Sequence, residues 1–133
     1  MNEEDFRNGQ VLLIDKPLNW TSFQVVNKIR WLIKNKFAIK KIKVGHAGTL
    51  DPLATGLLII CTGKMTKEIS IFQNQTKKYT GTFLIGTTTP SFDLETKPNN
   101  TFPINHINED SIINATKSFI GKIKQKPPIF SAI

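Results

Sequence analysis

The sequence predicts an α+β domain, and two patterns lead to this fold class. Segments with helical spacing of apolar residues mix with short apolar runs typical of strands, and the order lacks the regular spacing of βαβ units. The chain has 133 residues and a hydrophobic content of 39%, which is enough for one domain with a real core. Its apolar runs are much shorter than a membrane span.

The first third of the chain is expected to form one strand and one helix. Residues 10–14 are a short apolar run that predicts a strand, ended by residues 15–17. Thr21 and Gln24 have the spacing of a helix capping box. A basic connector over residues 36–43 follows the helix. The apolar residues at helical spacing predict one buried face, which consists of Phe23, Val26, Ile29 and Ile33.

The middle of the chain predicts a loop, a strand, a helix and a second strand. Residues 43–56 are rich in glycine and lead into a predicted strand over residues 57–62. Residues 64–72 are expected to form a short helix. Residues 77–86 alternate with the period of a strand. The positions on one side of that strand are Tyr79, Gly81, Phe83 and Ile85.

The last part of the chain predicts a loop, a helix and a short strand. Residues 87–100 are polar and contain two prolines, so we expect a long loop. Residues 108–120 have helical periodicity, and Gly121 is a natural stop. Residues 122–126 predict a last short strand. The apolar positions of the helix are Ile112, Ala115, Phe119 and Ile120.

The charge of the chain favours a polyanionic partner. Eighteen Lys and Arg against ten Asp and Glu give a formal charge of +8 and a pI of about 9.8. Nucleic acid is the first expectation and an anionic membrane the second, with a merely solvated basic surface as the alternative. Cys61 is the only cysteine, which fits a reducing compartment, and we expect it to be buried. The acidic N-terminus is not a secretory signal, so we expect a cytoplasmic protein.

The chain lacks the motifs of metal, nucleotide and hydrolase sites. His46 and His106 are far apart, and no Cys or carboxylate stands at ligand spacing beside either. Lys64 is not preceded by a P-loop, and no dinucleotide fingerprint occurs. Ser22 and Ser131 lack the context of a nucleophile elbow. We therefore expect no metal and no cofactor.

The remaining candidate chemistry is one carboxylate with polar and aromatic neighbours. Asp51 stands in the glycine-rich loop, and Pro52 restricts its backbone. This arrangement suits an acid aimed at a substrate, but an Asp before Pro is also a common turn residue. Tyr79 follows two lysines and is a candidate to stack on a base, or an ordinary strand aromatic. His46 is either part of the site or a loop hydrogen-bonder.

Four segments, in the same order along the chain, resemble the motifs of one family. Residues 45–58, Gly-His-Ala-Gly-Thr-Leu-Asp-Pro-Leu-Ala-Thr-Gly-Leu-Leu, resemble the catalytic motif of the TruB family, the bacterial tRNA pseudouridine-55 synthases. Residues 15–23 resemble its Lys-Pro and Thr-Ser motif, and residues 78–93 resemble its tyrosine motif. Residues 125–132 resemble the start of a later motif.

The resemblance implies a mixed, largely antiparallel sheet flanked by helices. It also implies that residues 1–133 are the N-terminal portion of a catalytic domain, without the C-terminal remainder and the RNA-binding domain. The chain stops at Ile133 without a polar tail, which resembles a cut.

The resemblance further implies an activity and a set of site residues. The activity is isomerisation of uridine 55 in the T loop of tRNA to pseudouridine, without a cofactor, by a protein that binds the T arm. We expect this protein to be a monomer. Asp51 matches the catalytic aspartate, and Tyr79 matches the tyrosine that packs on the target base. His46 matches the histidine near the flipped-out nucleotide. Lys16 and Asp93 match substrate-binding positions near the cleft.

Two other functions stay open. The absent half of the protein and the charge of +8 fit an RNA-binding remnant that is catalytically dead. A guide-RNA-dependent pseudouridine synthase carries a similar Thr-Leu-Asp-Pro motif. Residues 53–56 and 64–67 are closer to the stand-alone bacterial type.

Overall fold

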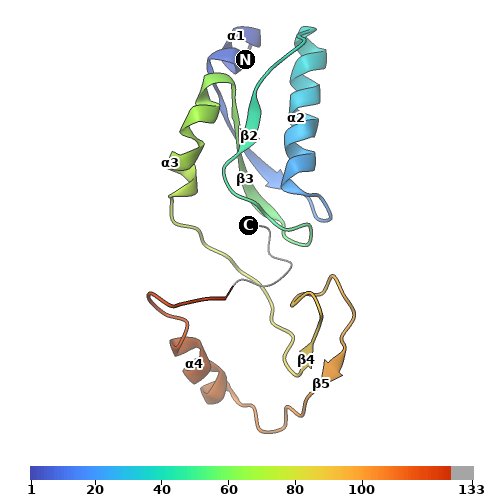
Figure 1. Ribbon diagram of the computed structural model, residues 1–133, viewed down its shortest axis with the longest axis vertical. Coiled ribbons are helices and arrows are strands. Elements are labelled where there is room, and N and C mark those ends of the chain that lie inside the picture. The colour runs from blue at the N-terminus through green and yellow to red at the C-terminus, as the bar shows by residue number, and fades with distance from the viewer. Residues whose placement is uncertain (127–133) are drawn as a thin grey trace. The chain divides into compact units, whose positions relative to one another are not determined.

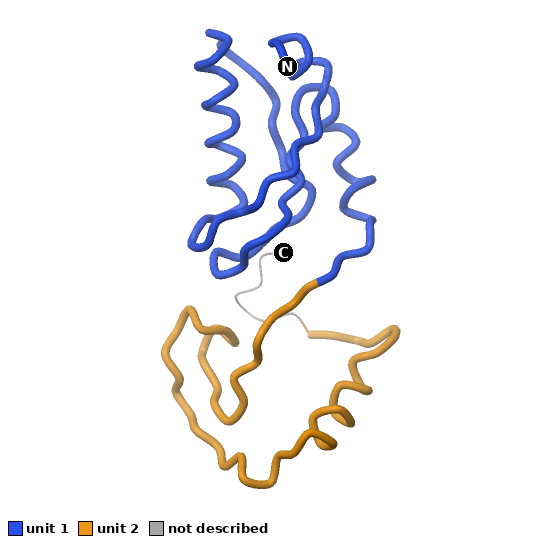
Figure 2. Tube along the Cα trace, turned by 180° about the vertical axis from the view of Figure 1, so that it is seen from behind, with its two compact units in different colours: residues 1–78 blue, residues 79–133 orange. Residues whose placement is uncertain are grey.

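The computed structural model describes residues 1–126, and the chain forms two compact units (Figure 2). The first unit is Met1–Lys78, and the second begins at Tyr79. Most of the segment 125–132, and Ser131 with it, lie outside the described residues.

The first unit contains an antiparallel sheet of three strands (Figure 1). These are β1 (Val11–Lys16), β2 (Val44–His46) and β3 (Gly56–Thr62), in the order β1-β3-β2. Both β1 and β2 pair with β3 in antiparallel fashion. The predicted α+β class is therefore confirmed, and so are two predicted strands, with β1 extending two residues beyond the predicted end.

The first unit also contains helices before, between and after these strands in the sequence. They are α1 (Glu3–Asn8), α2 (Ser22–Phe37), the 3-10 helix η1 (Gly63–Glu68) and α3 (Ile69–Gln73). Helix α2 begins with the predicted capping box, because Thr21 and Gln24 each accept a hydrogen bond from the other's backbone N–H. The predicted short helix over residues 64–72 is present as η1 followed by α3.

Helix α2 and the sheet share one hydrophobic core, but the buried face of the helix differs from the prediction. Val25, Val26 and Ile33 are buried with β3 residues, and Ile29 packs against them. The prediction that Phe23 belongs to the buried face is wrong, because 62% of its surface is exposed. Since successive residues are about 100° apart around a helix, Phe23 lies at the edge of this face. Cys61 is buried as predicted.

The second unit has little regular structure in its described part. It contains β4 (Thr87–Thr88), β5 (Asn100–Thr101) and α4 (Glu109–Lys117), and β4 pairs with β5. Asn108 caps α4 through a capping box with Ser111, and Gly121 has a φ of 86° soon after the helix ends. The predicted loop over residues 87–100 is confirmed except at its two ends, which belong to β4 and β5, and the predicted helix over residues 108–120 is present as α4, which ends at Lys117.

Two strands predicted in or at the edge of this unit are wrong. Residues 77–86 and 122–126 contain no strand. Alternation of side chains forms a strand only when a neighbouring strand supplies backbone hydrogen bonds, and within residues 79–126 only β4 and β5 pair. The apolar face predicted for the helix over residues 108–120 is also exposed, because no layer formed by residues 1–126 covers it. No helix within residues 1–126 is long and apolar enough to cross a membrane.

Candidate active site

Asp51 lies in the connection between two paired strands. Strand β2 ends at His46 and β3 begins at Gly56, so residues 47–55 form the loop of a β-hairpin, which we call the Asp51 loop. The backbone N–H of Ala47 extends the pairing with a 2.9 Å hydrogen bond to the carbonyl of Ile59. Gly48 and Gly56 have φ values of 120° and 119°, which side chains other than glycine rarely adopt.

Ser22 holds the residue just before Asp51. Its hydroxyl accepts a hydrogen bond from the backbone N–H of Leu50 at 2.9 Å and donates one to the carbonyl of Leu50 at 3.1 Å. Ser22 is the first residue of α2 and is 3% exposed. The start of α2 therefore fixes the backbone at residue 50.

Lys16 holds the residue just after Asp51. Its side chain is fully buried, and its ammonium donates to the carbonyls of Trp20 at 2.5 Å, Pro17 at 3.0 Å and Pro52 at 3.4 Å. The carbonyl of Pro52 also accepts a 2.8 Å hydrogen bond from the backbone N–H of Asn19. Burying an ammonium is costly unless its protons are bonded, and here three carbonyls satisfy it.

These contacts fix the backbone on both sides of Asp51 and leave its side chain free. Asp51 is exposed, and its carboxylate accepts no hydrogen bond from residues 1–126. The backbone N–H of Ala54 closes a turn onto the carbonyl of Asp51 at 3.0 Å. A carboxylate presented in this way can act as a nucleophile or as a base toward a bound group.

His46 stands at the base of the same loop. It is half-buried at the end of β2, and its Nδ1 is 2.7 Å from the carbonyl oxygen of Gly48. Since a carbonyl only accepts, Nδ1 carries the proton in this contact. The neutral ring then keeps Nε2 as an acceptor for another group.

Tyr79 and Asp93 belong to the second unit. Tyr79 is 75% exposed and directly follows Lys77 and Lys78. The Asp93 carboxylate accepts hydrogen bonds from the Ser91 hydroxyl at 2.6 Å and the Glu95 N–H at 2.9 Å. The Ser91 hydroxyl and then the Glu95 N–H lower the pKa of Asp93 below its usual value.

The structure thus brings Lys16, His46 and Asp51 into the first unit, around one loop. Ser22 belongs to the predicted Thr-Ser motif, but its contact with the backbone of Leu50 was not predicted. Its signal was its place beside the Thr21 cap, where a helix start can bond a neighbouring backbone. Residues 1–126 contain no group of three or more His, Cys, Asp or Glu side chains that could hold a metal ion.

A family model described as TruB family pseudouridylate synthase (N terminal domain) matches residues 34–133, which include the Asp51 loop. The chain belongs to the TruB family. The family predicted from the motifs is therefore confirmed.

Curated relatives are similar over nearly the whole chain. A protein named tRNA pseudouridine synthase B from Flavobacterium johnsoniae is 65% identical, with 100% of this chain and 58% of the relative covered. Proteins of the same name from Phocaeicola vulgatus and Chlorobaculum tepidum are 59% and 48% identical. For these two, 96% and 94% of this chain and 54% and 51% of the relative are covered. The chain spans about half the length of the curated relatives it matches.

Proposed function

We propose that residues 1–133 are the N-terminal portion of the catalytic domain of a tRNA pseudouridine synthase. Its target is uridine 55 in the T loop, and Asp51 is the essential catalytic residue. The observation that carries this proposal is the exposed Asp51 carboxylate on a loop whose backbone is fixed at Leu50 and Pro52, within the segment that matches the TruB family. The relatives named tRNA pseudouridine synthase B support tRNA as the substrate.

The reaction is an isomerisation of one nucleoside. The bond between N1 of uracil and C1′ of ribose breaks, the uracil turns, and a bond forms between C5 and C1′. C5 loses a proton and N1 gains one, so atoms and electrons balance without an oxidant, a reductant or a group donor. A carboxylate that acts as nucleophile or base is sufficient for such a sequence.

The target base must first leave the RNA stack. Unstacking costs about a few kcal/mol, and stacking on an aromatic side chain returns roughly 1–3 kcal/mol per base. Tyr79 is exposed and next to two lysines, which suits a base stack beside a phosphate contact. His46 offers Nε2 at the base of the Asp51 loop, where it would meet the flipped nucleotide.

Lys16 and Asp93 would act in different ways from these residues. Because the Lys16 ammonium is buried against three carbonyls, we propose that it positions the Asp51 loop and that it serves the RNA only through that loop. The Asp93 carboxylate is bonded within its own turn, so its proposed part in RNA binding is to shape residues 91–95.

The test uses the full protein and a complete tRNA transcript that carries tritium at C5 of its uridines. No guide RNA and no cofactor are added. We expect release of one equivalent of tritium per tRNA, and pseudouridine at the T-loop uridine alone. Binding without any release would favour the RNA-binding remnant, and release only with an added guide RNA would favour the guide-dependent class. Either result overturns the proposal.

A further inference from the structure

We propose a second RNA contact, a phosphate-binding pocket at the end of β3 opposite the Asp51 loop. This basic pocket has a volume of about 330 Å³. It is a size that suits a ligand site. Its cationic lining residues are Arg7, Lys41, Lys43, Lys64 and Lys67. The proposal rests on the proposed function, because it assigns a further part of the same RNA to this surface.

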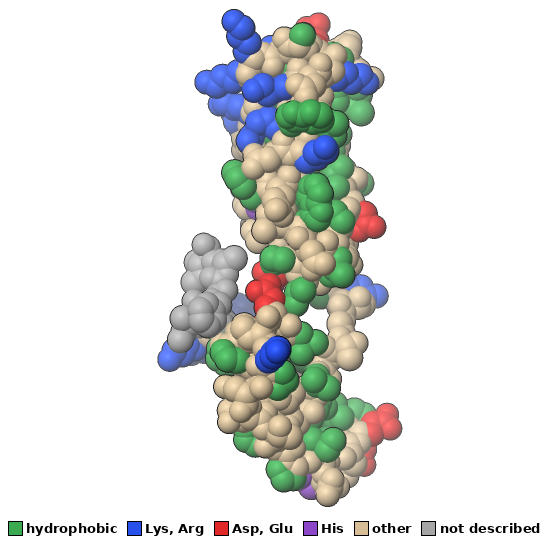
Figure 3. Space-filling view, turned by 90° about the vertical axis from the view of Figure 1, so that its right-hand side faces the viewer, with side chains coloured by type: hydrophobic (Ala, Val, Ile, Leu, Met, Phe, Trp, Pro, Cys, Tyr) green, Lys and Arg blue, Asp and Glu red, His purple; other side chains and the backbone are tan. Residues whose placement is uncertain are grey.

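The basic pocket is built by three segments that meet where β3 ends. Arg7 comes from α1, Lys64 and Lys67 come from η1, and Lys41 and Lys43 precede β2. Figure 3 shows Lys and Arg side chains gathered at the top of the view, at this end of the first unit. The pocket therefore collects cations from across the sequence.

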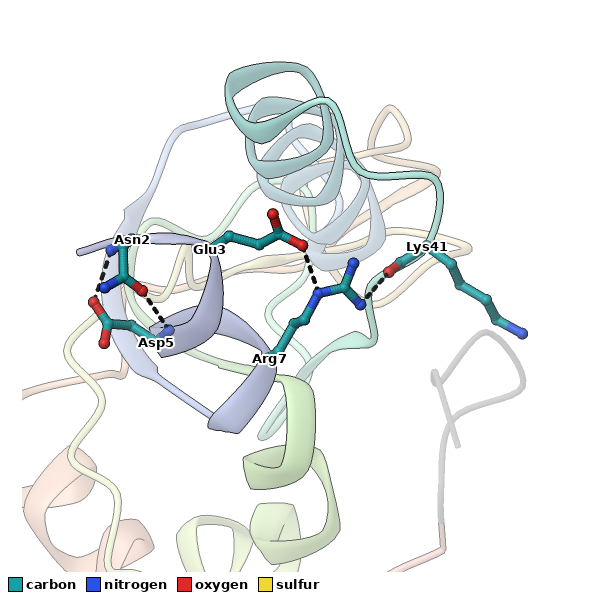
Figure 4. Close-up of polar contacts among 5 residues, drawn as sticks. All are labelled: Asn2, Glu3, Asp5, Arg7 and Lys41. Carbon is teal, nitrogen blue, oxygen red and sulfur yellow. Dashed lines mark hydrogen bonds and ion pairs between the residues drawn. The ribbon is translucent and has the colours of Figure 1, made fainter.

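Hydrogen bonds to backbone carbonyls hold these segments together. The N–H of Gly63 donates to the carbonyl of Lys43 at 2.9 Å, and Arg7 Nη1 donates to the carbonyl of Lys41 at 3.4 Å (Figure 4). The Thr62 hydroxyl, which is buried, donates to the carbonyl of Phe6 at 3.0 Å. The walls of the pocket are thus fixed before a ligand arrives.

The charge of the basic pocket is almost uncompensated. Arg7 pairs with Glu3 at 2.7 Å, which is the single ion pair found within residues 1–126. The four lysines have no carboxylate partner in that part of the chain, and Lys64 Nζ bonds only the neutral Asn8 amide at 3.0 Å. Like charges gathered in this way repel one another, and a polyanion relieves the repulsion.

The lining chemistry favours RNA phosphates as the ligand. Lysine is a flexible point charge, which suits phosphate contacts that carry no sequence information. None of the lining residues is aromatic, so the described pocket offers no platform for base stacking. This surface would therefore hold the sugar–phosphate backbone, whereas base recognition takes place elsewhere.

The position of the basic pocket defines which part of the RNA reaches it. The Asp51 loop ends at Thr55, and Gly63 is the first pocket residue after β3, so the seven residues of β3 separate them. At a rise of about 3.3 Å per residue, the separation is about 23 Å. The contact therefore lies in the tRNA body beyond the loop that holds the target uridine.

The experiment compares two double variants of the full protein. Lys43→Ala with Lys67→Ala removes two pocket lysines whose side chains make no hydrogen bond within residues 1–126. Lys28→Ala with Lys36→Ala removes the same charge from exposed positions of α2, where each ammonium lies over a neighbouring aromatic ring, and is the charge-matched control. Affinity is measured over a range of salt concentrations for complete tRNA and for an isolated T-loop oligonucleotide too short to span the two sites. Thermal unfolding of both variants is measured to check that they keep the wild-type stability.

We expect the pocket variant to bind tRNA roughly tenfold more weakly at low salt, and its slope of log K against log salt to fall by about 1.4 to 1.8. We expect little change for the short oligonucleotide and for the control variant. Equal losses in both double variants, or an equal loss with the short oligonucleotide, would overturn the inference. If the pocket variant forms pseudouridine normally and binds tRNA with unchanged affinity, the pocket inference is wrong and the proposed function stands. If tRNA binding depends on the pocket but the wild type forms no pseudouridine, only the proposed function is wrong.

Discussion

Lys16 is buried, and its ammonium connects separate segments of backbone by hydrogen bonds. Its ammonium joins the turn after β1, at Pro17 and Trp20, to the Asp51 loop at Pro52. Buried hydrogen bonds to charged groups are stronger than neutral ones, and a carbonyl left without a donor costs further free energy. One side chain therefore links stability to the position of the candidate catalytic residue.

Lys16→Met keeps most of the side-chain length and removes the ammonium. We expect it to lower the free energy of unfolding by roughly 2 to 4 kcal/mol, because three carbonyls lose a charged donor. Urea denaturation measures this loss. Lys40→Met, at an exposed position after α2, is the control and should stay within about 0.5 kcal/mol of the wild type. Equal free energies of unfolding for both variants would show that the hydrogen bonds of Lys16 do not stabilise the fold.

Asp93 illustrates a carboxylate whose pKa is set by its own turn. The hydroxyl of Ser91 is the largest cause of its lowered pKa, followed by the N–H of Glu95. A depressed pKa means that the turn gains stability above the usual pKa of 3.8 and loses it as the pH falls through the lower folded-state value.

Ser91→Ala should raise the pKa of Asp93 toward 3.8, because the charged form loses its hydroxyl donor. An acid titration that follows the Asp93 carboxyl carbon by NMR measures the change. Ser118→Ala, at the C-terminal cap of α4, removes a hydroxyl away from this turn and should leave the titration unchanged. A Ser91→Ala titration that overlays the wild-type curve would contradict the assignment.

At the scale of elements, the junction between β3 and η1 depends on close backbone approach. Gly63 has a φ of 52°, and a Cβ built there would overlap the carbonyl oxygens of Phe6 and Arg7. Helix α1 therefore packs against backbone that only glycine permits. The same junction forms one wall of the basic pocket.

Gly63→Ala should destabilise the protein by more than about 2 kcal/mol, because α1 must move away from the end of β3. Gly81→Ala is the matched control, since a Cβ there meets nothing within 4 Å. The control should be neutral within about 0.5 kcal/mol. Thermal or urea unfolding of the two variants gives the comparison, and a tolerated alanine at residue 63 would refute the close packing.

Local signals predicted the elements that carry their own caps and periodicity. The capping box at Thr21 and the apolar run of β3 are such signals, and α1 had one that was overlooked, the capping box of Asn2 with Asp5. Strand β2 could not be recognised, because three residues inside a glycine-rich loop become a strand only by pairing with β3. The predicted strand over residues 77–86 failed for the converse reason, since its periodicity lacks a partner.

The sequence predicts which residues are candidates for the site, but it does not predict their burial or their hydrogen bonds. The motif resemblance gave Asp51 and His46 as site residues, and the structure places both at one hairpin loop. The burial of Lys16 could not be foreseen, because its partner Pro52 is 36 residues away. The bracing role of Ser22 depends likewise on a non-local contact, with Leu50.

At the scale of the whole molecule, the distribution of the formal charge of +8 matters for RNA binding. Spread evenly, it would give weak attraction to any polyanion. The first unit instead concentrates cations in the basic pocket at one end of β3 and presents the Asp51 carboxylate at the other. A tRNA that spans both ends would be held by its backbone while one uridine meets the acid.

The most direct test maps pseudouridine at single-nucleotide resolution in tRNA treated with the full protein or with Asp51→Asn. The substitution is nearly isosteric, and the Asp51 carboxylate accepts no hydrogen bond from residues 1–126, so the fold should be unchanged. We expect complete modification of the T-loop uridine by the wild type. We expect the rate with Asp51→Asn to fall by at least about a thousandfold, with tRNA binding retained. Pseudouridine formation by Asp51→Asn at the wild-type rate would contradict the catalytic role of Asp51.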